Sequence, residues 1–562
     1  MTNFSKDNTA QTSSINAIEL AVIRSALANA AEEMSVTVWR TSRTSVVREL
    51  LDYSTCVFDA SGFSIAQSAR MPVHLNSMAS CLQDLIQHHI PLDEWHDGDV
   101  VMTNDPYSGG QHLPDVQTFA PVFVNGERVG IVGILVHHLD VGGGAPGSYY
   151  PQATEVFQEG IRIPPVRVVR RGEVNDDLIK VFLRNSRAPD SVGGDLNSQL
   201  AALRVGANTL AGIAEKFTPV RLAAACTAIQ NESEALMREK IRAVPNGRYT
   251  FTDYVDGDGQ GSGPLAIQAT ATVNDDTIEV DLAGSAPQAA GPINCTFNMT
   301  SSAVVCAVLM SIGEDVPANA GCYRPIEIYA PEGTLVNAVE PAPVANRMAV
   351  GHRVVNTVMG CFAEALPGRV PAAYYGVSYA YALQAIQPDG KRPVYFDLEC
   401  GGWGAHAEGD GASAFSCGFH NGANSPVEMI EQDYPVTFLR YGLVPDSGGT
   451  GQHRGGLGLQ REFRLDAPKG VFAANLERFE TAPYGLNGGG PGRKGRLLLR
   501  RAGETEETSL GGKVSGIELS AGDAIRLETS GGGGFGPSTQ RHEDRIAQDH
   551  AQGYVTGEVT DA

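Results

Sequence analysis

Apolar side chains recur at three- and four-residue spacing near the start of the chain, at Ile15, Ile18, Val22, Ala26, Ala30 and Met34. This spacing predicts that a long amphipathic helix opens the fold. A hairpin is expected over residues 56–66, and short apolar runs at 100–102 and 130–136 predict further strands. Residues 198–243 predict two helices, separated at Thr218-Pro219, where a threonine N-cap precedes a first-turn proline.

The pattern changes after Gly247. Apolar and polar residues alternate over 266–273 and 277–282, which predicts strands, whereas 301–312 and 353–366 predict helices. The last third, 435–536, is rich in glycine and in β-like runs, and it predicts a β-sandwich or a barrel-like module.

Together these elements predict an α+β fold: a large mixed multi-domain chain with an N-terminal α/β region and a β-rich C-terminal region. The expected divisions are a disordered tail, an N-terminal α/β region, a central α+β region, a Gly-rich β region and a flexible tail, over 1–14, 15–245, 246–434, 435–537 and 538–562.

Composition narrows the class of partner. The formal net charge of −22 over 562 residues argues against nucleic acid and anionic membranes, because both select basic surfaces. No apolar run reaches the roughly 18 residues of a transmembrane helix, and the polar N-terminus shows no secretory signal. Nine scattered cysteines without C-x-x-C spacing indicate reduced thiols, so we expect a cytoplasmic protein.

Two glycine-flanked loops carry the densest candidate chemistry. His112 and Asp115 lie three residues apart in one of them, and His137 and His138 end the apolar run at 130–136. If the two neighbouring strands end together, one imidazole from each loop and the Asp115 carboxylate can reach one ion. Imidazole and carboxylate ligands suit Zn, Mn or Fe. The spacing alone equally allows hydrogen-bonded loop residues beside a Gly-rich turn.

A further carboxylate near position 50 can complete such a site. Both Glu49 and Asp52 are candidates. On local sequence alone, an ion pair between Arg48 and a neighbouring acid is the alternative.

Several familiar catalytic signatures are missing from the sequence. The phosphate-loop pattern G-x-x-x-x-G-K-[ST] does not occur, and neither does G-x-S-x-G. The chain therefore offers no recognisable ATP site and no recognisable serine or cysteine nucleophile of its own.

Long motifs in one order resemble the B-type subunit of the hydantoinase/oxoprolinase family, which is related to a subunit of the acetone and acetophenone carboxylases. The resemblance covers about residues 15–537. It is carried by Asn104-Asp-Pro-Tyr-Ser-Gly-Gly-Gln-His-Leu-Pro-Asp-Val, His137-His-Leu-Asp-Val-Gly-Gly, Gly401-Gly-Trp-Gly-Ala, Arg454-Gly-Gly-Leu-Gly and Thr529-Ser-Gly-Gly-Gly-Gly-Phe-Gly, among others. Gln111 departs from the family, where threonine is common beside the histidine.

The resemblance implies one half of a two-component enzyme. An A-type ATPase subunit would bind ATP and activate a cyclic amide, and this chain would supply a divalent-metal site in its N-terminal region. The matching positions imply the ligands Asp52, His112, Asp115 and His137, with Glu49 as the alternative to Asp52. Asp105 and Asp140 are the carboxylates expected to activate water for ring opening.

Three activities remain open at this point. The first is ATP-dependent opening of a hydantoin, lactam or oxoproline-like ring within a hetero-oligomer. The second is the ketone-carboxylase branch of the same scaffold, and the third is a non-catalytic scaffold for the ATPase subunit. Strand alternation further predicts that His138 points away from His137 and packs or faces solvent on the other side.

Overall fold

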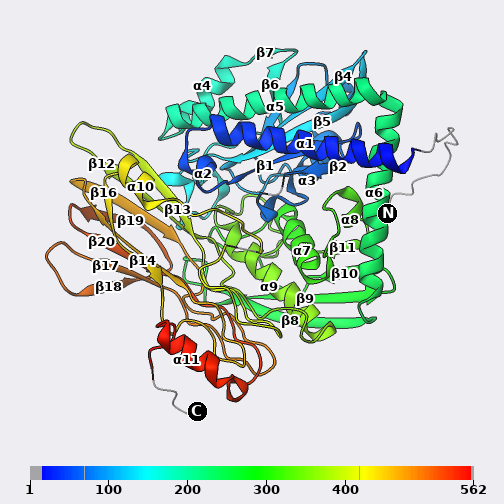
Figure 1. Ribbon diagram of the computed structural model, residues 1–562. Helices are drawn as coiled ribbons and strands as arrows, with labels where there is room; N and C mark the ends of the chain where they lie inside the picture. Colours follow the sequence, from blue (N-terminus) through cyan, green and yellow to red (C-terminus); the bar gives the residue numbers. More distant parts are fainter. Residues whose placement is uncertain (1–14, 69, 417, 558–562) are drawn as a thin grey trace.

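The computed structural model describes residues 15–68, 70–416 and 418–557. The disordered tail predicted over 1–14 lies outside the described residues. Mixed helices and sheets build the chain, as predicted. They form three regions: the N-terminal region lies at the top of Figure 1, and the central region and the C-terminal β-sandwich lie side by side beneath it. Among the described residues, none of the helices combines the length and the apolar run that crossing a bilayer requires.

An antiparallel seven-stranded sheet of order β2-β1-β5-β4-β3-β6-β7 forms the N-terminal region. Its strands are β1 (Tyr53–Phe58), β2 (Ser64–Gln67), β3 (Val100–Thr103), β4 (Asp115–Val124), β5 (Glu127–His137), β6 (Val166–Arg170) and β7 (Glu173–Val174). The helices α1 (Ala17–Thr41) and α5 (Pro189–Phe217) run side by side over one face (Figure 1). The other face packs on α3 (Ser77–His88) through a separate apolar cluster.

The predicted helix boundaries in this region have local causes. The opening helix α1 begins after Asn16, whose side chain accepts a hydrogen bond from the Glu19 N–H. Helix α6 (Pro219–Arg242) follows α5 at the predicted break, where the Thr218 side chain caps the N–H of Arg221. The shorter helices are α2 (Ser45–Arg48) and α4 (Asp176–Asn185).

The central region packs two buried helices on a four-stranded sheet of order β11-β10-β9-β8. Its elements are β8 (Gly247–Val255), β9 (Leu265–Asn274), β10 (Thr277–Asp281), α7 (Phe297–Ile312), α8 (Ala320–Tyr323), β11 (Ile326–Tyr329) and α9 (Arg347–Ala365). Helix α9 begins six residues before the predicted start. Nearly all of its side chains are buried, so the sequence lacks the alternation of apolar and polar positions from which the extent of a helix is predicted.

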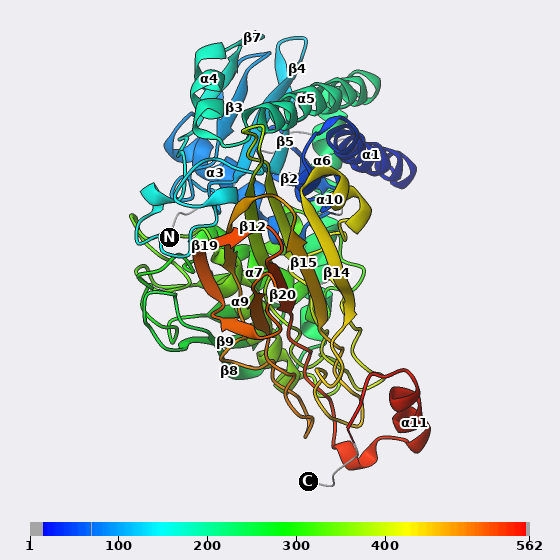
Figure 2. The ribbon, with the colours of Figure 1, turned by 90° about the vertical axis from the view of Figure 1, so that its left-hand side faces the viewer.

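Two antiparallel sheets packed face to face confirm the predicted β-sandwich (Figure 2). One is β13-β12-β16-β19 and the other is β14-β15-β20-β17-β18, and Tyr381 of β12 stacks on Phe463 of β15 between them. The elements are β12 (Tyr379–Ile386), β13 (Val394–Glu399), α10 (Val427–Asp433), β14 (Val436–Leu443), β15 (Leu459–Leu465), β16 (Lys469–Asn475), β17 (Arg496–Arg500), β18 (Glu507–Leu510), β19 (Lys513–Ser520) and β20 (Ala524–Glu528). Strands β12 and β13 thus join the sandwich from the segment predicted to be central.

The glycine-rich motifs meet below the sandwich. The segment Gly531–Gly534 runs among several other extended segments, and its four N–H groups donate to the carbonyl oxygens of Arg493, Gly456, Ala373 and Gly490. A Cβ on any of these four glycines would lie deep inside the van der Waals radius of a neighbouring backbone carbonyl. Close backbone approach explains these glycines, since no larger residue fits.

The chain beyond Ser538 differs from the predicted flexible tail over 538–562. It forms helix α11 (Glu543–Ala551), and the buried Asp549 pairs with Arg454 at 3.2 Å and with Arg541 at 2.7 Å. The prediction rested on the missing apolar face, whereas ion pairs with the glycine-rich loops hold this helix. Residues 558–562 lie outside the described residues.

The glycine packing can be tested with one methyl group. We expect Gly533→Ala to lower the free energy of unfolding by about 3 kcal/mol, because the added Cβ overlaps the Tyr484 carbonyl and backbone atoms cannot move aside. Gly442→Ala in β14, where a Cβ meets open space, is the matched control and should be neutral or slightly stabilising. Thermal and urea unfolding of both variants measure the difference, and equal stabilities would contradict the packing argument.

Candidate metal centre

Three carboxylate and imidazole side chains form a row across neighbouring strands. Strand β5 lies between β1 and β4, and Asp115 pairs directly with His137 in the β4–β5 register. On the other side, the His137 N–H donates to the carbonyl oxygen of Asp52, just before β1. Residues directly opposite one another share a sheet face, so the three side chains point the same way. His112 joins them from the loop before β4, where its carbonyl oxygen accepts from the Asp115 N–H.

The polar atoms of His112, Asp115 and His137 converge on one point. Asp115 Oδ1 lies 3.0 Å from His112 Nε2 and 3.0 Å from His137 Nδ1, and the two nitrogens are 3.2 Å apart. All three side chains are buried, and their ligand atoms lie within 4.8 Å of one another. Neighbouring ligands at about 2.1 Å from an octahedral ion would be about 3.0 Å apart, and tetrahedral ligands about 3.4 Å. The spacing therefore fits a divalent ion.

The protonation state of His112 also fits a cation. Its Nδ1 lies 3.1 Å from the carbonyl oxygen of Ala345, an acceptor that requires a proton on this nitrogen. Burial lowers the pKa of His112 to about 3, and the positive charge of Arg347 adds to this effect, so the ring is neutral. The Nε2 lone pair then faces the Asp115 carboxylate oxygen. Two acceptors at this distance are stable only with a proton or a metal ion between them.

The structure separates the two candidates for the fourth ligand. The Asp52 Oδ2 lies 3.8 Å from His137 Nδ1, just outside the compact triad, and burial raises the pKa of this carboxyl to about 6. Glu49 instead pairs with Arg48 at 3.8 Å, directly after α2. Of the two carboxylates, Asp52 is the one that lies beside the triad.

His138 packs on the opposite side from His137, as strand alternation predicts. Its Nε2 lies 3.4 Å from the Gln199 side-chain oxygen of α5, and its ring meets Phe182 of α4 edge to face. Burial lowers the pKa of His138 to about 4, so the ring is neutral. The sheet therefore lies between His138 and the triad.

Asp105 and Asp140 are held by other partners. Asp105 receives two hydrogen bonds from the Arg162 guanidinium, at 3.0 and 2.9 Å, and one from the Tyr107 N–H. Asp140 accepts from the backbone of Gly142, Gly147 and Arg187 and from the Arg187 guanidinium. These contacts hold the two glycine-rich loops and do not extend to the triad.

Sequence reasoning missed four side chains around the triad. Arg347, at the start of α9, donates to Asp115 Oδ2 at 2.5 Å, and Phe396 of β13 stacks on the His137 ring. Tyr149 lies edge-on to His112, and His74 lies 3.9 Å from Asp52. Arg347 and Phe396 come from the central region and the sandwich, more than 200 residues further along the chain. Nothing in the local spacing of the histidines could have indicated them.

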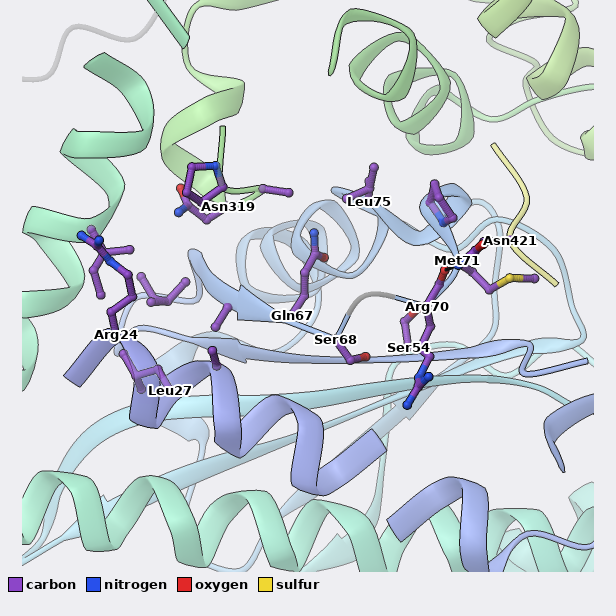
Figure 3. A pocket seen from close by; sticks show the side chains of 17 residues that line it. Arg24, Leu27, Ser54, Gln67, Ser68, Arg70, Met71, Leu75, Asn319 and Asn421 are labelled. Atoms are coloured by element: carbon purple, nitrogen blue, oxygen red, sulfur yellow. Dashed lines mark hydrogen bonds between the residues drawn. The ribbon is translucent and has the colours of Figure 1, made fainter. Parts of the chain in front are cut away.

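A cleft of about 510 Å³ opens close to this centre (Figure 3). Ser54 lines it, and the Ser54 Oγ lies 2.9 Å from His74 Nδ1, so one histidine ring spans the distance between the cleft and Asp52. The lining combines apolar side chains such as Leu27 and Leu75 with the amides of Gln67, Asn319 and Asn421. None of the 17 lining residues is acidic.

Comparison with known proteins decides the family. The family described as hydantoinase B/oxoprolinase matches residues 16–538. The chain belongs to this family. A protein of Pseudomonas sp. (strain NS671), provisionally named as the B-type subunit of a D-/L-hydantoinase, is 32% identical over 97% of this chain and 94% of its own length. The beta-type chain of the caprolactamase of Pseudomonas jessenii is 32% identical over 96% and 94%.

Two solved structures show the same architecture. The ATP-dependent caprolactamase from Pseudomonas jessenii matches with a TM-score of 0.90 at 30% identity, over 96% of this chain and 95% of that chain. The nucleotide-free acetone carboxylase matches with a TM-score of 0.86 over 95% and 78%. At 19% identity, the second likeness shows the fold alone.

Metal content tests the centre directly. We expect the purified protein to carry about one divalent ion per chain, and His112→Ala to lose it, because one of about four ligands disappears. Asp52→Asn should weaken metal retention, whereas Glu49→Gln should leave it unchanged, since Glu49 faces Arg48. Elemental analysis after dialysis measures all four proteins. A metal-free wild type, or full occupancy in His112→Ala, would rule out these ligands.

Proposed function

We propose that this chain is the B-type subunit of a two-component, ATP-dependent cyclic amidohydrolase that opens a hydantoin, lactam or oxoproline-like ring. The buried triad of His112, Asp115 and His137 is the observation that carries the proposal. Relatives named as hydantoinase and caprolactamase subunits support the substrate class. The chain spans about two fifths of the 5-oxoprolinase 1 of Arabidopsis thaliana, which is 30% identical to it.

Ring opening needs activation because the amide carbonyl is resonance-stabilised and its nitrogen leaves poorly. A divalent ion held by His112, Asp115, His137 and Asp52 would supply an activated water and polarise the carbonyl. The chain's own contribution is orientation. The Ala345 carbonyl fixes the tautomer of His112, and Arg347 fixes the Asp115 carboxylate, so both ligands are positioned before substrate arrives.

The cleft of Figure 3 has a chemistry that suits a neutral cyclic amide. Apolar walls accommodate ring methylenes, and the amide groups of Gln67 and Asn421 can exchange hydrogen bonds with a ring carbonyl and N–H. Asp105 and Asp140 remain candidates for activating water. Their ion pairs with Arg162 and Arg187 favour the simpler role of holding the loops in place.

The site that binds ATP would lie on another chain, because this sequence has no phosphate loop. We propose an A-type ATPase subunit as the partner in a hetero-oligomer, located in the cytoplasm. The ketone-carboxylase branch is the second candidate, supported by the shared fold with acetone carboxylase. A non-catalytic scaffold is disfavoured. A protein that needed only to pack would not require the buried His112 Nε2 lone pair to face the Asp115 carboxylate.

Reconstitution with the A-type subunit tests the function. We expect ATP hydrolysis that depends on a cyclic amide and yields the ring-opened product, measured by phosphate release and mass spectrometry. His137→Ala should reduce turnover by more than about a hundredfold. Loss of a residue that only orients a metal ligand costs about 10–100-fold, and loss of a residue that itself binds the metal should cost more.

His138→Phe is the matched control for this experiment. A phenyl ring keeps the contact with Phe182 on the far side of the sheet, so activity should fall only modestly. Turnover that requires bicarbonate and a ketone would instead establish the carboxylase branch. Wild-type activity in His137→Ala would contradict the proposed centre.

A further inference from the structure

The N-terminus of helix α9 lies beside the triad. Ala345, just before the helix, contacts His112 through its carbonyl oxygen, and Arg347, the first helical residue, contacts Asp115. The helix is 19 residues long, so its N-terminal end carries the partial positive charge of the helix dipole. Such an end attracts anions when donors are free to receive them.

Two adjacent buried side chains at this end have unused hydrogen-bonding atoms. Asn346 is fully buried and occupies the N-cap position without capping the helix, and neither atom of its amide has a partner among the residues that the structure describes. Arg347 is 3% exposed. Its Nη2 donates to Asp115 and its side chain also interacts with Tyr149, while within the described part of the chain neither Nε nor Nη1 has a partner in hydrogen-bond geometry. More than nine in ten buried polar groups in proteins are hydrogen-bonded, so four unpaired atoms together need an explanation.

The backbone just before these two residues is held by the buried Glu159 side chain. Glu159 accepts from the N–H of Val344 at 3.1 Å and from the N–H of Ala345 at 2.8 Å. The backbone leading into α9 is thereby fixed from a separate segment of the chain. A donor set that is rigid and already desolvated binds a ligand without a large cost of reorganisation.

We propose that Asn346 and Arg347, at the N-terminus of α9, form an oxyanion-binding site next to the triad. The ligand is a group with two or more anionic oxygens. It is either the phosphoryl group of the substrate activated by the ATPase or the carboxylate of the opened ring. The planar guanidinium offers parallel donors to such a group while Nη2 stays on Asp115. This inference deepens the proposed function and rests on it for the identity of the ligand.

Binding of inorganic phosphate to the purified full chain tests the site without any turnover. Isothermal titration and ³¹P line broadening should show saturable binding, both with metal and after chelation. Asn346→Asp should raise the dissociation constant at least tenfold. Aspartate suits an N-cap position and should fold, but it places a negative charge at the site. Arg347→Lys should weaken binding similarly, because lysine lacks the fork.

Two controls make the result specific. Arg167→Lys changes a guanidinium on β6, two strands away from β4 in the sheet, that pairs with Asp99. This variant should leave phosphate binding unchanged. Acetate titrated in parallel separates the sources: stronger phosphate binding indicates a phosphoryl ligand, and stronger acetate binding indicates a product carboxylate.

Several outcomes would overturn the proposal. The first is no saturable binding of either anion, and the second is a dissociation constant of Asn346→Asp within twofold of wild type. The third is binding that disappears when the metal is chelated but is unchanged in both variants. The last would place the anion on the metal alone. Failure of the proposed function is distinguishable. In that case the reconstituted pair would not open a cyclic amide, yet the isolated chain would still bind phosphate in a manner that depends on Asn346.

Discussion

The Asp115 carboxylate joins the N-terminal sheet to the central region and organises the site. Its Oδ1 lies 3.0 Å from both His112 Nε2 and His137 Nδ1, and its Oδ2 accepts from Arg347 at 2.5 Å. The positions of His112, His137 and Arg347 therefore all depend on this one carboxylate. Without the carboxylate, Arg347 would be a buried charge with no counterion, a loss that typically costs about 3–5 kcal/mol. The same contact that positions this candidate metal ligand therefore also fixes α9 against β4.

Buried ion pairs also connect the central region to the sandwich. Arg478, which follows β16, pairs with Asp253 of β8 at 3.2 Å, and its neighbour Glu477 lies 3.7 Å from Arg353 of α9. Asp256, just after β8, accepts from the N–H groups of Phe479 and Thr481. Such contacts fix geometry more than they add stability, because desolvating the charges offsets much of their attraction. Because β13 belongs to the same sheet as β16, these contacts also set the position of Phe396 against the His137 ring.

The proposed division of labour with an ATPase subunit is consistent with the same construction. The triad, the cleft and the end of α9 sit where the regions meet, so the chain presents a rigid and largely desolvated centre. Rigid, pre-positioned donors suit the second half of a reaction, in which an activated molecule is received and hydrolysed. The segment Gly531–Gly534 contributes by packing, because it places backbone against backbone.

Local sequence determined most of the secondary structure and part of the site. The Thr218-Pro219 break, the strand ending at His137 and the opposite directions of His137 and His138 follow from capping chemistry and strand alternation, which act over a few residues. The helix start at Arg347 and the docked helix α11 did not follow. The first lies in a helix buried on all sides, and the second is held by charges on Arg454 and Arg541 rather than by an apolar face. The resemblance favoured Asp52 over Glu49, but the positions of Asp52 beside the triad and of Glu49 beside Arg48 came only from the tertiary structure, as did the presence of Arg347, His74, Tyr149 and Phe396 around the triad. These side chains meet because separate sheets, helices and loops pack together, and local sequence spacing carries no information about such tertiary contacts.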